Sequence, residues 1–440
     1  MRVLAWSGLD DGAREQLLGR GVTAIFDPQL RESVDLIIND VREHGDTAVI
    51  RALAKFDGCD VAEGGLQVTE GEFAAARDLV PAPVQEAIAE GIANVRAFNE
   101  ELTREREWRV EIQPGLTVGE KSTAIASAGL FIPSGKGSFP SVLVQIGTPA
   151  VVAGVPEIAV VVPPLPGGDG EVDPAVLCAA DQLRIRQLFR ANGPAGVAAL
   201  AFGTESIPKV RKVLGPGSPP VQAAQIACQQ HGCHTQMLLG PSESLIIADD
   251  SADPRLLAAD LLNEAEHGPD SASVLVTDSE SLIEAAQLEI ASQIALLPEP
   301  RRAYAHTALG ENGGAILVTD LAEAAAVANW YAPEHMQIVA RDEEAVLAMI
   351  DHAGEVLLGQ QTPMSLANYV IGVPAALPTG AFARVTGGVT AETFLKKVSI
   401  AKADAGALQR LSPAALALAD HEGFPAHAAA LRARGDGTNQ

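Results

Sequence analysis

The sequence predicts an α/β protein made of two doubly wound units, with small segments at its two ends. From Gly129 onward, short apolar strand-like runs alternate with helical patterns, and a second alternating block occupies residues 243–378. This alternation is typical of parallel sheets covered by helices on both faces. The 440 residues, 47% hydrophobic and 20% charged, contain enough apolar material for more than one core.

The charge balance argues against one large class of function. There are 31 basic and 56 acidic side chains, which gives a formal net charge of −25. A surface of this sign repels phosphate, so binding to nucleic acid is not expected. Aromatic residues make up only 4% of the chain, so stacking platforms for bases are also scarce.

The beginning of the chain and its cysteines predict a cytoplasmic protein. The first residues lack the basic and apolar regions of a signal peptide, and Asp10 interrupts them early. The longest apolar stretch, 141–166, is divided by Pro149 and Pro156, which favours a buried helix and strand over a membrane span. Four cysteines in so long a chain do not predict a disulfide framework.

The first third of the sequence is mainly helical in pattern. Residues 1–30 form a small separate segment, and a helix follows over 31–56 with a break at Gly45. A second helical pattern spans 83–104, and strand-like pieces run from 108 to 119. These elements precede the regular alternation.

The alternating blocks supply the predicted sheets. A strand at 128–132 leads into the Gly/Ser-rich loop 134–138, and strands at 158–162 and 186–190 follow. Further strands are expected at 244–248, 273–277 and 314–318, and a tail rich in Ala and Leu after Ala403 predicts helix. No G-x-G-x-x-G fingerprint follows any of these strands. The expected division is a segment 1–30, a discontinuous first α/β domain of 31–133 and 243–388, a second domain 134–242 on the nucleotide side, and a helical C-terminal segment 389–440.

Two segments combine acidic and imidazole side chains. Glu264 and His267 lie three apart before Gly268-Pro269, so they share a helix face and could reach one metal ion, or form an ordinary surface pair. Glu334 and His335 follow Pro333, which fits either an acid–base pair or the first turn of a helix.

Two further clusters carry metal-binding residue types. The segment 420–427 places Glu422 and His427 within an alanine-rich tail, where a frayed end is the simpler interpretation. Cys228, His231, Cys233 and His234 have the composition of a metal site but lack a second knuckle, which favours a helix end and loop.

Taken together, the motifs resemble those of the histidinol dehydrogenase family over nearly the whole chain. They are Gly45–Ala48, Lys55–Gly58, Gly129–Pro133, Thr148–Ala150, Ala198–Ser206, Gly215–Gly217, Gly240–Glu243, Ala265–Asp270, Pro333–His335, Leu377–Thr379 and Glu422-Gly423 with His427. The resemblance implies incomplete Rossmann-like domains in a zinc-dependent, NAD-linked homodimer. Such an enzyme oxidises a primary alcohol to a carboxylate in two hydride transfers.

The resemblance also assigns roles to matching positions. It makes His335 the general base and Glu334 the activator of the water that attacks the bound aldehyde. It also implies a zinc ion that anchors the substrate, with Glu264, His267, Asn368 and His427 as its ligands. Ser242 and Glu422 match substrate contacts, and Glu422 reaches the site from the partner subunit.

Several positions depart from the family pattern, so the resemblance is that of a divergent member. The family has an amide at position 264 and a carboxylate at position 368, and here the two are exchanged. The family's nucleotide contacts, a tyrosine, a glutamine and an asparagine, are Phe131, Ala195 and Ser218 in this chain. Each change removes or shortens a hydrogen-bonding group, and each bond contributes about 1 kcal/mol.

The substrate-binding histidine of the family's T-N-H motif is replaced by Ala375, so histidinol is only the reference substrate. The segments 370–372, 386–388 and 394–396 resemble sulfopropanediol dehydrogenases instead. The sequence therefore predicts a dehydrogenase acting on histidinol or another small amino or sulfo alcohol. The alternative is a paralogue that keeps zinc and the Glu-His pair but not NAD, with lyase, hydrolase or cyclase chemistry; an idle binding protein is a third possibility, which the intact pair disfavours.

Overall fold

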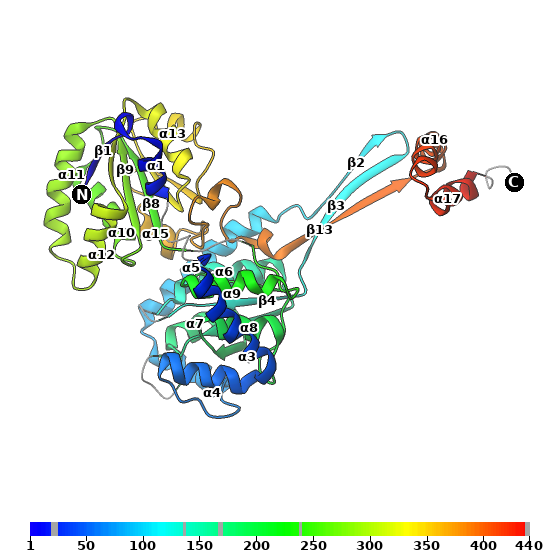
Figure 1. Ribbon diagram of the computed structural model, residues 1–440, viewed down its shortest axis with the longest axis horizontal. Coiled ribbons are helices and arrows are strands. Elements are labelled where there is room, and N and C mark those ends of the chain that lie inside the picture. The colour runs from blue at the N-terminus through cyan, green and yellow to red at the C-terminus, as the bar shows by residue number, and fades with distance from the viewer. Residues whose placement is uncertain (19–24, 135–137, 166–169, 237–239, 436–440) are drawn as a thin grey trace. The chain divides into compact units, whose positions relative to one another are not determined.

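The computed structural model describes residues 1–18, 25–134, 138–165, 170–236 and 240–435 (Figure 1). The chain divides into two compact units. The first comprises Met1–Glu101 and Ile125–Phe394, and the second comprises Leu102–Ala124 and the described part of Leu395–Gln440. The first unit has a mixed α/β fold with two parallel sheets, as the alternation predicts.

The larger sheet has six parallel strands in the order β1-β10-β9-β8-β11-β12. Their bounds are β1 Val3–Ala5, β10 Gly314–Leu317, β9 Ala272–Thr277, β8 Glu243–Ala248, β11 His335–Val339 and β12 Glu355–Leu358. Helices α10 (Pro254–Ala265) and α11 (Glu280–Ile294) lie on one side of it, and α13 (Leu321–Tyr331) lies on the other (Figure 1).

Alternating burial explains how this sheet holds helices on both faces. Ile246 of β8 packs in the apolar cluster that contains α10 and α11, whereas its neighbours Leu245 and Ile247 pack in the cluster that contains α13. Successive side chains of a strand point to opposite faces, so a strand buried on both sides reads as one continuous apolar run. That run is the signal by which the sequence predicts β8, β9 and β10.

The smaller sheet has four parallel strands in the order β6-β5-β4-β7. They are β6 Gln187–Arg190, β5 Glu157–Val162, β4 Ser127–Phe131 and β7 Lys212–Leu214. The associated helices are α3 (Pro28–Ala52), α6 (Pro140–Ala153), α7 (Pro174–Gln182), α8 (Gly193–Phe202) and α9 (Pro219–Gln229). The apolar stretch 141–166 thus contains most of helix α6 followed by strand β5, as the sequence predicts. No described helix is long and apolar enough to cross a membrane.

The strand pairing differs from the expected grouping of 31–133 with 243–388. β4 pairs with β5 and β7 of the smaller sheet, and α3 packs against α8 and α9. The larger sheet is instead completed by β1 from the first residues of the chain. Apolar periodicity identifies elements but not their spatial order, and a three-residue strand carries no periodic signal.

Local signals within the helical region behave as the sequence predicts. Helix α3 has a break at Gly45, whose φ of 52° lies in the left-handed region. Helix α5 (Ala82–Leu102) closely matches the predicted helix 83–104. The predicted loop 134–138 includes residues 135–137, which lie outside the described residues.

The second unit contains a three-stranded antiparallel sheet, β13-β3-β2, followed by two helices. The strands are β2 Glu107–Gln113, β3 Leu116–Ala124 and β13 Leu395–Ala403, and the helices are α16 (Ala405–His421) and α17 (Pro425–Gly435). The helical tail after Ala403 is confirmed, but the segment 389–440 is not wholly helical because it includes β13. The polar sequence of that strand gave no buried-strand signal.

Candidate active site

Glu334 and His335 lie where α13 passes into β11. Ala332 ends the helix with a φ of 49°, and His335 is the first residue of the strand. The interpretation of this segment as a helix start is therefore wrong. Both side chains are buried, which favours the acid–base interpretation over a solvated pair.

One ring nitrogen of His335 is held by a glutamate that the sequence analysis did not identify. His335 and Glu355 are direct partners in the parallel pairing of β11 with β12. Nδ1 of His335 forms a hydrogen bond with Oε1 of Glu355 at 2.5 Å, and both side chains are buried. In the sequence, Glu355 is visible only as a charged residue that follows Gly354 at the start of a strand. Its relation to His335 becomes apparent only from the pairing of the two strands.

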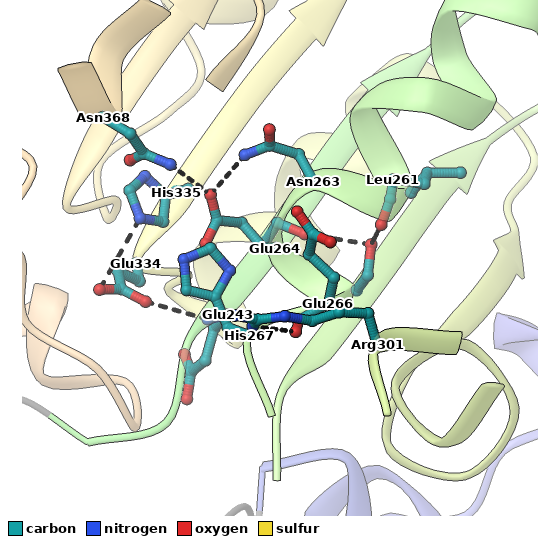
Figure 2. Close-up of polar contacts among 12 residues, drawn as sticks. Glu243, Leu261, Asn263, Glu264, Glu266, His267, Arg301, Glu334, His335 and Asn368 are labelled. Atoms are coloured by element: carbon teal, nitrogen blue, oxygen red, sulfur yellow. Dashed lines mark hydrogen bonds and ion pairs between the residues drawn. The ribbon is translucent and has the colours of Figure 1, made fainter. Parts of the chain in front are cut away.

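The other ring nitrogen faces Glu334. Nε2 of His335 lies 3.8 Å from Oε1 of Glu334 (Figure 2). The backbone N–H of Glu243 donates to Oε2 of Glu334 at 2.9 Å, which fixes the carboxylate. Glu243 is itself buried, and its Oε1 accepts from the backbone N–H of Gly380 at 2.9 Å.

The buried charges shift the ionisation of this pair. Burial raises the pKa of Glu334 to about 8, with the charges of Glu264 and Glu243 adding to the effect and His335 opposing it. Burial lowers the pKa of His335, but the carboxylates of Glu264, Glu334 and Glu355 outweigh burial and raise it to about 10. The site therefore favours a positively charged imidazole among carboxylates.

The structure brings together three of the four predicted metal ligands. Glu264, in the last turn of α10, is almost completely buried, and its Oε1 accepts from Nδ2 of Asn368 and Nδ2 of Asn263, each at 2.7 Å. Nδ1 of His267 lies 3.4 Å from Oε2 of Glu264. Figure 2 shows these side chains converging on the Glu264 carboxylate beside His335.

The burial of Glu264 excludes the surface-pair interpretation. Burial opposes ionisation of Glu264, but the nearby His335 and His267 and the two amides outweigh it and lower its pKa below the ordinary value. Such a carboxylate stays ionised and can act as a cation ligand. Within the described part of the chain, no group of three or more His, Cys, Asp or Glu side chains forms a metal cluster; this set depends on an amide as its third member.

The fourth predicted ligand and one substrate contact belong to the second unit. Glu422 follows the end of α16, and His427 lies in the first turn of α17, with its ring 5.1 Å from that of Phe424. Both side chains are exposed. The segment is ordered helix and turn rather than a frayed end, and Asp420 pairs with Arg432 at 3.1 Å.

The other predicted substrate position, Ser242, is half-buried immediately before β8. Its carbonyl accepts from the backbone N–H of Ala272 at 3.0 Å, which anchors it to the start of β9. Its neighbour Glu243 holds the carboxylate of Glu334. Ala375, at the family's histidine position, donates its backbone N–H to Oε1 of Gln145 at 3.3 Å.

The predicted nucleotide contacts gather at the carboxyl edge of the smaller sheet. Phe131 ends β4, Ala195 lies in the first turn of α8, and Ser218 immediately precedes α9. The strand order reverses at β4, with β5 and β6 on one side and β7 on the other, and ligands of open α/β sheets bind at such points. Phe131 and Ala195 are buried in the core, whereas Ser218 is exposed.

The cysteine-histidine cluster forms a helix end and loop, as the sequence analysis favours. α9 ends at Gln229, and Cys228 and Cys233 belong to the apolar core. Burial raises the pKa of the Cys228 thiol to about 12 and that of Cys233 to about 11, so thiolate ligands are disfavoured. His231 and His234 are exposed.

Comparisons with known proteins agree with this arrangement. The sequence model of histidinol dehydrogenase matches residues 23–435. Histidinol dehydrogenase homolog 2 of Mesorhizobium japonicum is 42% identical over 422 residues, covering 96% of this chain and 95% of that protein. Histidinol dehydrogenase of Xanthomonas euvesicatoria is 39% identical over 435 residues, covering 99% of each. The crystal structure of histidinol dehydrogenase from Elizabethkingia anophelis has a TM-score of 0.92 at 30% identity and covers 100% of this chain and 98% of that one. The chain therefore belongs to the histidinol dehydrogenase family.

Proposed function

We propose that the protein is a zinc-dependent, NAD-linked dehydrogenase that oxidises a small polar primary alcohol through a bound aldehyde to a carboxylate. The family supports oxidation of a CH–OH group in general. The observation that carries the proposal is the buried pair of His335 and Glu334, with Nε2 of the imidazole 3.8 Å from the carboxylate. Four unpaired cysteines suit the cytoplasm, where thiols stay reduced.

The donor chemistry of the Glu264 cluster fits a zinc ion. A carboxylate, an imidazole and an amide oxygen would come from Glu264, His267 and Asn368, and His427 would complete four ligands with a second imidazole. Asn368 ligates only through its Oδ1, so its amide, which donates Nδ2 to Glu264, would have to present its other end. When bound, the metal would anchor the hydroxyl of the substrate.

The carboxyl edge of the smaller sheet fits a nucleotide mainly through the backbone at one helix. The N-terminus of α8 opens onto this edge and can offer backbone N–H groups to phosphate, whereas α9 begins with Pro219-Pro220, which lack an N–H. Of the three predicted contact positions, only Ser218 has a polar side chain. NAD, when bound, would accept the hydride.

The protein's own groups have distinct tasks in this chemistry. Once its Nε2 proton has been lost, His335 is the base that takes the hydroxyl proton, and the carboxylates around it stabilise the imidazolium that results. Glu334 lies beside Nε2 and, once ionised, orients and activates the water that attacks the aldehyde. Burial of both groups removes competing water from the reacting centre.

The shared site implies a homodimer. Glu422 and His427 lie in the second unit, whose strand β2 has three apolar residues, Trp108, Val110 and Ile112, exposed at alternate positions. Alternate residues of a strand share one face, and an exposed apolar row of this kind is typical of an interface. We propose that this unit serves the active site of the partner subunit.

A second candidate is a diverged paralogue that retains zinc and the Glu-His pair but does not use NAD. It is favoured by the apolar, buried side chains at positions 131 and 195, which give a nucleotide no hydrogen bond. A base and an activated water suffice for lyase, hydrolase or cyclase chemistry.

The decisive experiment measures NAD binding and turnover in purified, zinc-loaded protein. Calorimetric titration with NAD should saturate, and incubation with histidinol and a panel of amino and sulfo alcohols should yield two NADH per carboxylate formed. His335→Ala should abolish turnover at unchanged zinc content, while His306→Ala, which changes an exposed residue of α12 (Arg301–Thr307), should not alter it. Absence of both NAD binding and NADH formation would favour the paralogue.

A further inference from the structure

We propose that Glu355 is a positioning residue for His335, which holds the imidazole with Nδ1 protonated so that Nε2 is the atom that accepts the proton. That the proton comes from the hydroxyl of the substrate rests on the proposed function. The positioning of His335 by Glu355 rests on the geometry of the two side chains alone.

Strand register places the two side chains together. His335 and Glu355 are the first residues of β11 and β12 and direct partners in the parallel ladder, so their side chains leave the same face of the sheet. The backbone N–H of Glu355 also donates to the carbonyl of Glu334 at 3.1 Å, which extends the pairing by one residue. Backbone hydrogen bonds thus fix the distance between imidazole and carboxylate.

The surroundings assign the two nitrogens different tasks. Three carboxylates face the imidazole: Glu264 from α10, Glu334 from the segment before β11, and Glu355 from β12. Glu355 is the one that bonds to Nδ1, at 2.5 Å, and an ionised carboxylate only accepts, so Nδ1 carries the hydrogen. Nε2 is left facing Glu334.

The Glu355 carboxylate has no competing task within the described residues. Its Oε2 is buried and has no hydrogen-bond partner there, so the bond to His335 is its one side-chain contact of this kind. Retaining a buried carboxylate for one imidazole is costly, which argues for a role in the chemistry of that imidazole.

Glu355 takes part in the proton transfer of the proposed oxidation. The O–H bond of the substrate breaks and its proton passes to Nε2, while the C–H bond breaks, a C=O bond forms, and NAD, when bound, would accept the hydride. The imidazole then carries a positive charge, which the carboxylate of Glu355 stabilises at Nδ1.

Two substitutions separate the charge of Glu355 from its hydrogen bond. In Glu355→Gln the amide oxygen can still accept from Nδ1 but the charge is lost, whereas Glu355→Ala loses both functions; kcat should fall in both variants, by as much as about 10⁴-fold where the correct tautomer is lost. KM for alcohol and NAD should stay within about twofold in both variants, because Glu355 orients the base rather than binding the substrate. Glu157→Gln, at the half-buried first position of β5, is the matched control and should retain wild-type kcat.

Imidazole ¹⁵N chemical shifts test the positioning without turnover. At a pH where the imidazole is neutral, the His335 signals, identified by their loss in His335→Gln, should show protonated Nδ1 in the wild type and a changed tautomer population in Glu355→Ala. Adding Glu355→Gln to His335→Gln should cause no further loss of activity, since the two residues act as one unit.

An unchanged tautomer in Glu355→Ala, or additive losses in the double variant, would overturn the proposal. If the wild type forms no NADH but Glu355→Ala still changes the tautomer of His335, the proposed function is contradicted and the positioning role remains supported. Melting temperatures and zinc contents of all variants exclude simple unfolding as the cause of lost turnover.

Discussion

Asn368 of α15 (Met364–Tyr369) donates its amide to the carboxylate of Glu264 in α10 at 2.7 Å, so the two positions whose side chains are exchanged relative to the family are in contact. A reciprocal exchange can preserve a set of metal ligands only if the two side chains are in contact. In either arrangement, one carboxylate and one amide then face the same point. The pair links two helices that are about a hundred residues apart in the chain.

The exchange can be reversed by mutation. Glu264→Gln alone removes the carboxylate ligand and should weaken zinc binding by at least about 10-fold. The double variant Glu264→Gln with Asn368→Asp restores one carboxylate and should recover most of the affinity. Zinc content and competition with a chromophoric chelator measure this, and a double variant as weak as the single one would contradict the shared metal role.

Nucleotide affinity should respond to the exposed position. Ser218→Asn lengthens the polar side chain before α9 and should tighten NAD binding about 5-fold if it gains one hydrogen bond. Calorimetry measures the change, with Ser399→Asn, an exposed serine of β13, as control. Equal affinity in Ser218→Asn and wild type would argue against this edge as the nucleotide site.

The second oxidation should depend on Glu334 more than the first. Glu334→Gln keeps the shape of the side chain but cannot activate water, so aldehyde should form while acid production falls about 100-fold or more. Trapping the aldehyde with a hydrazine reagent and counting NADH per acid separates the two steps. Unimpaired acid production would remove Glu334 from the second step.

Stability should depend on pH through Asp260 of α10. Burial raises its pKa to about 6 from 3.8, with Gln337 partly opposing the shift. Between these values the unfolded chain releases the proton first, so the stability contribution of this group falls as pH rises, and the penalty is complete above about pH 6. Asp260→Asn should therefore stabilise the protein at pH 7 by about 3 kcal/mol.

Urea unfolding at a series of pH values measures this effect. The gain in Asp260→Asn should vanish toward pH 3.8 and below, where Asp260 is protonated in both states. Asp351→Asn, which changes an exposed carboxylate, is the control. An equal gain at every pH would indicate that charge burial is not the cause.

Sites shared between subunits should show complementation. His335→Ala and Glu422→Ala should each be inactive, but mixed dimers contain one site with both wild-type residues. Random mixing should restore about a quarter of wild-type activity, since half of the dimers are mixed and each has one intact site. No recovery after mixing would place both residues in the site of a single subunit.

The sequence allows much of the fold to be predicted, and physical reasons explain the rest. The strands β8, β9 and β10 were found because burial on both faces makes them continuous apolar runs. β1 and β13 were missed, the first because it has three residues and the second because most of its side chains are exposed.

The candidate site shows the same limit. Glu334 and His335 are adjacent in sequence, so their association is visible without a structure. Glu355, twenty residues away, is related to His335 only through strand register, and no spacing rule reports that. Glu264 and Asn368 meet through helix packing, which the family resemblance could suggest but the residues alone could not.

The register of β11 places His335 opposite Ser244 of β8 on one side and Glu355 of β12 on the other. This row of three exists only when all three strands have paired, because a slip of one residue would send a side chain to the opposite face. During refolding, helices can form before the strands come together. Recovery of catalytic activity should therefore require the pairing of β8, β11 and β12 and follow the return of helical circular dichroism.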